Sequence, residues 1–138
     1  MIFSSTIQSF PNVIHGFTTR TGPHDSLLDL GREATPQVWA HVAQTLDAED
    51  FGVARISQVH GAGVVWASSP GMAGEADAVI TDTPGLLIAV RTADCVPILV
   101  VGDGVVGAIH AGWRGLAAGV IPAAIEQMRF CGPLTAVV

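Results

Sequence analysis

Residues 86–110, which read LLIAVRTADCVPILVVGDGVVGAIH, decide the fold. Three continuous apolar runs lie within this stretch, at 86–90, 96–101 and 105–109. Runs of this length and composition are typical of strands that are buried on both faces of a sheet. Asp103 and Gly104 separate the last two runs and indicate a tight hairpin turn. The stretch therefore predicts three strands, with the polar residues 91–95 between the first and the second.

Working outward, the flanking sequence predicts more strands and two helices. The further strands are expected at 14–19, 56–59, 64–67 and 76–81, with a last one starting at Thr135. Apolar residues recur at helical spacing over 35–46, where Thr35 is a suitable N-cap and Pro36 suits the first helical position. The alanine-rich residues 116–128 predict a second helix. Because proline is tolerated only in the first turn, Pro122 requires this helix to start late or to kink.

Composition narrows the possible classes of protein. A chain of 138 residues suits one domain, expected here over 1–138. With 49% hydrophobic and 13% charged residues, either much of it is buried sheet or some apolar surface is covered by segments or subunits outside this sequence. A net charge of −6 with only six Lys and Arg disfavours nucleic-acid binding and favours a small-molecule substrate. No apolar run is long enough to span a bilayer, and the N-terminus lacks the features of a secretory signal, so a cytoplasmic protein is expected.

His60, Cys95 and His110 each stand where a predicted strand ends or a turn begins. Side chains at such places are often functional, because a rigid scaffold positions them. Zinc binds histidine nitrogen and cysteine thiolate, and a site with three protein ligands keeps a fourth position for water or substrate. The spacing alone also allows buried histidines and a core thiol. We therefore treat these residues as candidate metal ligands and candidate catalytic residues.

Neighbouring residues add further candidates. His110 is followed by Gly112 and by a predicted helix, so backbone N–H groups beside the imidazole could bind an anion, with Arg114 adding charge. Asp94 precedes Cys95 within the polar interruption, where it could orient a ligand, act as a general base or cap a turn.

Four ordered motifs resemble one family. They are Gln58-Val59-His60-Gly61, Ala76-Asp77-Ala78 with Thr81-Asp82, Arg91-Thr92-Ala93-Asp94-Cys95-Val96-Pro97 and His110-Ala111-Gly112-Trp113-Arg114-Gly115. The sequence is similar to the YfiH or laccase-domain family, also called multicopper polyphenol oxidase-like. That family includes bacterial peptidoglycan editing factors and enzymes that metabolise purine nucleosides.

The resemblance implies an α/β (α+β) fold, a layered sandwich of mixed β-sheets flanked by helices. It also implies that His60, Cys95 and His110 are zinc ligands. The implied activity is that of a purine nucleoside phosphorylase, with adenosine deaminase and methylthioadenosine phosphorylase activity in the same pocket. Purine nucleosides and phosphate would then be the small-molecule partners, and Arg20, Arg114 and Gly112 are the expected phosphate-binding residues.

The sequence departs from the family pattern in two places. Asp29 stands where members commonly have asparagine. Members are also usually much longer, so the domain is expected to be incomplete on its C-terminal side. Cys131 has no assigned role beyond a buried thiol.

Three other functions stay open at this point. Cys95 could be the nucleophile of a cysteine hydrolase or amidase that edits a peptidoglycan precursor, with His60 or His110 as its base. A copper-dependent polyphenol oxidase is disfavoured, because a multicopper centre needs more histidines than the five in this chain. The chain could also be a non-catalytic module that binds a partner and holds no metal.

Overall fold

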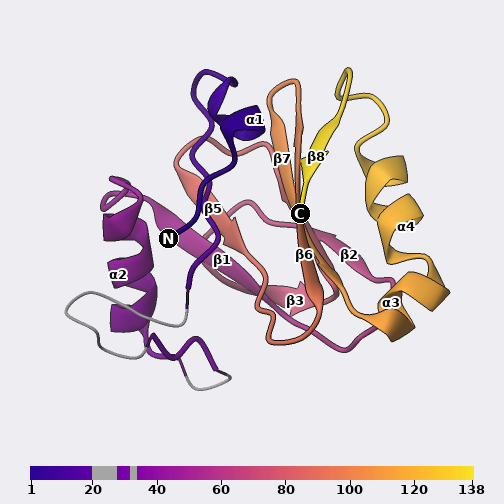
Figure 1. Ribbon diagram of the computed structural model, residues 1–138, viewed down its shortest axis with the longest axis horizontal. Coiled ribbons are helices and arrows are strands. Elements are labelled where there is room, and N and C mark those ends of the chain that lie inside the picture. Colours follow the sequence, from indigo (N-terminus) through magenta and orange to yellow (C-terminus); the bar gives the residue numbers. More distant parts are fainter. Residues whose placement is uncertain (20–27, 32–33) are drawn as a thin grey trace. The chain divides into compact units, whose positions relative to one another are not determined.

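The computed structural model describes residues 1–19, 28–31 and 34–138. Contacts divide the chain into two compact units, Met1–Phe51 and Gly52–Val138, which are described separately below (Figure 1). A single domain over the whole chain stays a prediction. Across the described ranges, no helix combines the length and the apolar character that crossing a membrane would need.

The N-terminal unit contains two helices, α1 (Ser5–Gln8) and α2 (Pro36–Thr45). The predicted helix at 35–46 is confirmed as α2, which begins at Pro36 after the extended N-cap residue Thr35. The strand expected at 14–19 is wrong, because pairing in this region is limited to a single antiparallel bridge between Ile2 and Phe17. The β-branched residues here favour an extended backbone, but among the described residues no neighbouring strand continues the ladder.

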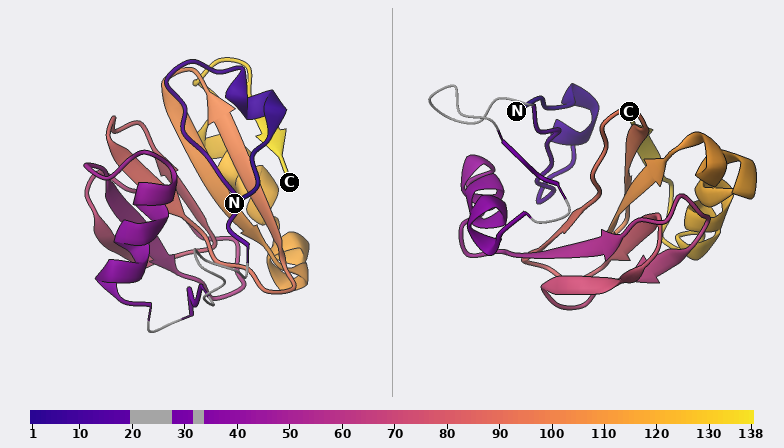
Figure 2. Two further views of the ribbon diagram at one scale, coloured as in Figure 1. Left: turned by 60° about the vertical axis from the view of Figure 1, so that its left-hand side comes forward. Right: turned by 90° about the horizontal axis from the view of Figure 1, so that it is seen from below.

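Two sheets form the second unit (Figures 1 and 2). Its strands are β1 (Gly52–Ser57), β2 (Val64–Trp66), β3 (Gly71–Glu75), β4 (Ala78–Thr81), β5 (Leu86–Ala89), β6 (Val96–Gly102), β7 (Val105–Ala111) and β8 (Thr135–Val137). The smaller sheet has the order β3-β1-β5 and is parallel, and the larger has the order β2-β4-β7-β6-β8 with parallel and antiparallel pairs. The larger sheet is mixed, as expected, whereas the smaller sheet is parallel throughout.

Alternating side chains of the five-stranded sheet build two apolar cores. In β4, Ala78 and Ile80 face one core and Val79 the other, as the two-residue period of a strand requires. The first core lies between this sheet and helix α4 (Val120–Gln127), which follows the shorter helix α3 (Trp113–Ala118). Val120 and Ala124 of α4, and Met128 directly after it, enter this core. Residues from both sheets contribute to the second core. Figure 2 shows the resulting order of smaller sheet, larger sheet and helices.

Other predicted elements differ from the structure in detail. The hairpin at Asp103 and Gly104 joins β6 to β7, as expected, with Gly104 at a positive φ of 68°. β5 and β6 are only partly buried, not buried on both faces. The helix expected at 116–128 is two helices, because the chain turns at Gly119 with φ 88°. Pro122 thereby falls in the first turn of α4, where it is tolerated.

His15 provides a test within the N-terminal unit. Its side chain is buried, and the Ser4 backbone N–H donates a hydrogen bond to its Nε2, at 2.8 Å. Burial lowers the pKa of His15, and only an unprotonated Nε2 can accept this hydrogen bond.

We expect the NMR titration midpoint of His15 to lie below the ordinary histidine value of about 6.5. As the pH falls, the unfolded chain binds a proton at His15 before the folded protein does. The contribution of His15 to the free energy of unfolding should therefore be full above about pH 6.5 and should decrease as the pH drops towards the folded pKa. A His15→Gln variant, which keeps an acceptor but cannot titrate, should lose less stability than wild type between pH 7 and pH 5 in urea unfolding. A midpoint at or above 6.5 would contradict the prediction.

Candidate metal centre

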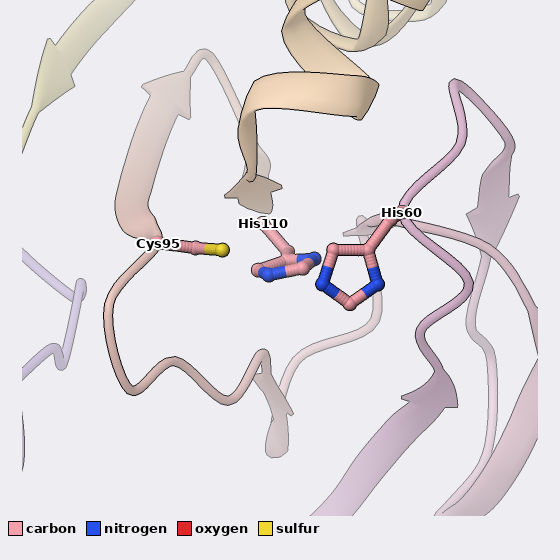
Figure 3. A group of neighbouring side chains, drawn as sticks. All are labelled: His60, Cys95 and His110. Atoms are coloured by element: carbon pink, nitrogen blue, oxygen red, sulfur yellow. The ribbon is translucent and has the colours of Figure 1, made fainter.

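Three separate segments bring His60, Cys95 and His110 together (Figure 3). His60 lies in the turn between β1 and β2, Cys95 directly precedes β6, and His110 belongs to β7. One ligand atom from each side chain lies within 4.8 Å of the others. The sequence prediction that these residues converge agrees with this geometry.

Exposure changes across the cluster. His60 is exposed, Cys95 is half-buried and His110 is buried. The two imidazole rings meet edge to face, with centroids 4.8 Å apart and an interplanar angle of 83°. Small molecules can therefore reach the cluster from the side of His60.

A buried carboxylate, Asp77, connects two of the three segments. Its side chain is 0% exposed, and its Oδ1 lies 2.8 Å from His110 Nδ1. The backbone N–H groups of Val59, His60 and Gly61 also donate hydrogen bonds to this carboxylate, at 3.2, 3.0 and 2.6 Å. Asp77 thus holds the turn that carries His60 against the strand that carries His110.

This arrangement determines the ionisation of the Asp77 carboxylate and the tautomer of the His110 imidazole. Burial by itself would raise the pKa of Asp77, but the hydrogen bonds from His110 and the three backbone groups outweigh burial and lower it. An ionised carboxylate only accepts hydrogen bonds, so the proton of His110 is on Nδ1. Its Nε2 is then free to act as a ligand, which is the usual role of a carboxylate behind a metal-binding histidine.

The backbone at His60 adopts a conformation that few residues with side chains adopt. Its φ is 61°, in the left-handed region. This conformation costs on the order of 1–3 kcal/mol in a residue other than glycine, and it persists only where the surrounding structure holds it. Here the hydrogen bonds to Asp77 from three successive residues, Val59 to Gly61, supply that constraint.

Two glycines allow the backbone to approach the cluster. A Cβ at Gly112 would lie 3.0 Å from Cys95 Sγ and 3.2 Å from His60 Cδ2, so Gly112 contacts the ligands directly. A Cβ at Gly115 would lie 2.9 Å from the Gly61 carbonyl oxygen, so this glycine lets α3 pack against the His60 turn. Neither glycine has a positive φ, so backbone conformation does not explain them. The lack of space for a Cβ does.

The other predicted site residues lie outside the cluster of three. Asp94 is exposed. Arg114 is exposed too, and its guanidinium carbon lies 5.2 Å from the ring centroid of Trp113. Arg20 lies outside the described residues. Their predicted roles in catalysis and phosphate binding stay predictions.

No role for Asp77 was predicted from the sequence, although the residue lies within the Ala76-Asp77-Ala78 motif. An acidic residue directly before the apolar strand β4 was the available signal, since a buried carboxylate needs partners. The partners themselves come from segments 16 to 33 residues away along the chain. Local sequence patterns do not reveal such pairings.

The donor set suits a metal ion. Two imidazoles and a thiolate are common zinc ligands, and with bonds of about 2.0–2.3 Å their ligand atoms would stand about 3.5 Å apart. Because the ligand atoms lie within 4.8 Å of one another, the side chains would have to close by no more than about 1.3 Å to bind one zinc ion. The cluster could therefore bind a metal through His60, Cys95 and His110.

Comparison with known proteins identifies relatives. Residues 15–136 match the family model described as multi-copper polyphenol oxidoreductase laccase. A purine nucleoside phosphorylase from Deinococcus radiodurans is 42% identical over 129 residues, which cover 84% of this chain and 50% of the relative. Another, from Streptomyces coelicolor, is 42% identical over 135 residues, covering 85% and 54%. The chain thus spans about half the length of the curated relatives it matches.

Solved structures agree with the fold. YlmD from Geobacillus stearothermophilus superposes with a TM-score of 0.71 at 26% identity, covering 88% of this chain and 53% of that one. The Neisseria meningitidis protein NMB0706 gives a TM-score of 0.64 at 31% identity, covering 88% and 52%. The expected α/β fold, with two sheet layers flanked by helices, is confirmed.

Asp77→Asn tests the role of the buried carboxylate. An amide has one oxygen, so either a backbone N–H loses its acceptor or the Asn amide donates to His110 Nδ1 and moves the imidazole proton to Nε2. We expect a loss of about 3 kcal/mol in unfolding free energy and about 10–100-fold weaker zinc binding. Urea unfolding and competition with a chromophoric chelator measure the two effects.

The matched control is Asp82→Asn, which changes an exposed carboxylate just beyond the other end of β4. It should leave both quantities near wild type. Wild-type zinc affinity in Asp77→Asn would contradict the orienting role.

Gly112→Ala tests the close approach. Its φ of −76° suits alanine, so the added methyl group acts by contact alone. Because Cys95 and His60 must give way by a few tenths of an ångström, we expect roughly tenfold weaker zinc binding at nearly unchanged stability. The control Gly61→Ala meets only ordinary contacts at 3.7 Å and should bind zinc as wild type does. Equal zinc affinities in both variants would refute the steric role of Gly112.

Proposed function

We propose that this chain, which belongs to the multi-copper polyphenol oxidoreductase laccase family, carries the zinc centre of a purine nucleoside phosphorylase. His60, Cys95 and His110 are the proposed ligands. The observation that carries the proposal is their convergence from three segments, with Nε2 of His110 left free by Asp77. The proposed reaction, phosphorolysis of purine nucleosides, is taken from the names of the relatives.

Zinc suits the cluster better than a set of copper ions. A catalytic zinc commonly has three protein ligands drawn from histidine, cysteine and carboxylates. A multicopper centre needs further groups of histidines. In the part of the chain that the structure describes, His60, Cys95 and His110 are the one group found with three metal-binding side chains. A zinc ion bound there would act as a Lewis acid on an oxygen atom of a substrate or of water.

The protein's own residues would hold the substrates. Phosphorolysis joins phosphate to C1′ of the sugar and releases the purine base, so it needs an anion site beside the nucleoside. The backbone at Gly112, with Arg114 and Arg20, is the proposed phosphate site. A nucleoside would approach from the exposed side of the cluster, where His60 lies.

Two further reactions are part of the proposal. Methylthioadenosine would be cleaved by phosphate as other purine nucleosides are. Adenosine would be deaminated when water replaces the C6 amino group and ammonia leaves. Asp94, exposed beside Cys95, is the proposed group that accepts a proton from this water.

A cysteine hydrolase or amidase is the second candidate, for which a peptidoglycan precursor would be the substrate. Cys95, His110 and Asp77 stand in the order nucleophile, base and orienting carboxylate, which favours this alternative. In that mechanism the thiolate would attack a carbonyl carbon and the imidazole would protonate the leaving amine.

Metal analysis and nucleoside assays test the leading proposal. We expect about one zinc ion per chain and release of hypoxanthine from inosine only when phosphate is present. His60→Ala should lower kcat/KM at least about 100-fold, because one of three ligands is lost. His41→Ala, in α2 of the other unit, is the matched control and should keep wild-type turnover. Unchanged turnover in His60→Ala would remove the metal from the mechanism.

A chelator separates the two candidates. In the zinc enzyme, chelation should abolish turnover and added zinc should restore it. In a cysteine hydrolase, chelation should leave cleavage of an amide substrate intact while alkylation of Cys95 abolishes it.

A further inference from the structure

The side chain of Gln58 joins two segments of the candidate metal centre. Its Nε2 donates a hydrogen bond to the Arg91 carbonyl oxygen at 2.7 Å, and its Oε1 accepts one from the Arg91 N–H at 2.8 Å. One side-chain amide thus binds both the donor and the acceptor of the Arg91 backbone. Gln58 lies two residues before His60, and Arg91 lies four residues before Cys95.

These bonds replace strand pairing at the place where it ends. The parallel ladder of β1 and β5 runs to the pair Arg55 and Ala89, and Arg91 lies two residues beyond it. After β1 the backbone turns towards Asp77, to which the three residues that follow Gln58 donate. The backbone of β1 is then no longer available to Arg91, and the amide of Gln58 takes its place.

The two side chains therefore share the task of assembling the cluster. Asp77 connects the His60 turn to His110. Gln58 connects the same turn to the segment that leads into Cys95. That segment, 91–95, lies between β5 and β6. Its far end is fixed where Val96 pairs with Ala111.

We infer that Gln58 is a positioning residue that fixes the segment 91–95, and with it the Cys95 thiol, relative to the two histidines. The inference rests on the proposed metal centre for its functional consequence. Both hydrogen bonds of the half-buried Gln58 amide go to the backbone of Arg91, so Gln58 acts through Arg91 and not on substrate.

Gln58→Ala in the full chain tests the inference. It removes both hydrogen bonds without adding charge or bulk. We expect about 10–100-fold weaker zinc binding, the usual effect of losing a group that orients a ligand. The cobalt-substituted variant should show a weaker or shifted thiolate-to-cobalt absorption band, since Cys95 is the displaced ligand. Gln127→Ala, which removes an exposed amide on α4, should match wild type in both measurements.

Amide hydrogen exchange supplies a readout that needs no metal. In Gln58→Ala, exchange should accelerate across 91–95 while the amides of β6 and β7 keep their protection. If wild type binds no zinc, the proposed function fails, and exchange alone decides the inference. Wild-type exchange across 91–95 in the variant would overturn it. So would wild-type zinc affinity together with an unchanged cobalt spectrum.

Discussion

The buried carboxylate of Asp77 is the constraint on which the rest of the site depends. A fully buried charge without partners would cost several kcal/mol, so the chain around it has to supply donors. Four N–H groups do so, three of them from successive residues of one turn. A left-handed residue within a turn lets successive backbone N–H groups point at one anion, and the left-handed backbone of His60 has this effect towards Asp77. The position of the first ligand is therefore a consequence of burying the carboxylate.

Close packing limits which types of residue fit beside Asp77 and the cluster of His60, Cys95 and His110. Gly112 stands where any side chain would contact Cys95 and His60, and Gly115 lets α3 reach the Gly61 carbonyl. Because β7 leads directly into α3, the helix begins beside the cluster. A Cβ at Gly115 would meet the backbone of Gly61, whereas a Cβ at Gly112 would press on the side chains of Cys95 and His60. The glycines next to the histidines thus act chiefly by making room.

The sequence revealed the parts of the structure that depend on local patterns. The hairpin at Asp103 and Gly104 and α2 could be predicted because turn residues and helix caps are visible locally. The convergence of His60, Cys95 and His110 was expected chiefly from the resemblance to a family, since their spacing alone also allowed buried histidines and a core thiol. β3 could not, since Gly71–Glu75 contains no β-branched residue and is held in place by its pairing with β1. The roles of Asp77 and Gln58 were missed for a related reason: their partners lie up to 33 residues away. The division at Gly119 was missed because an alanine-rich run hides a single left-handed residue.

The three candidate ligands are held in place to different degrees. Holding them for a metal ion is one requirement, and catalysing turnover is another. His110 lies in a strand that pairs on both sides, whereas His60 and Cys95 stand in loops that depend on Asp77 and Gln58. The residues that we find orienting the cluster all lie between Gln58 and Gly115, so this part of the chain contains a cluster that could bind a metal, together with its own supports. Phosphorolysis requires more, because phosphate and nucleoside must be bound in fixed positions beside the ligands. Loss of turnover alone therefore cannot identify a ligand, and weaker metal binding alone cannot separate a ligand from a residue that positions one.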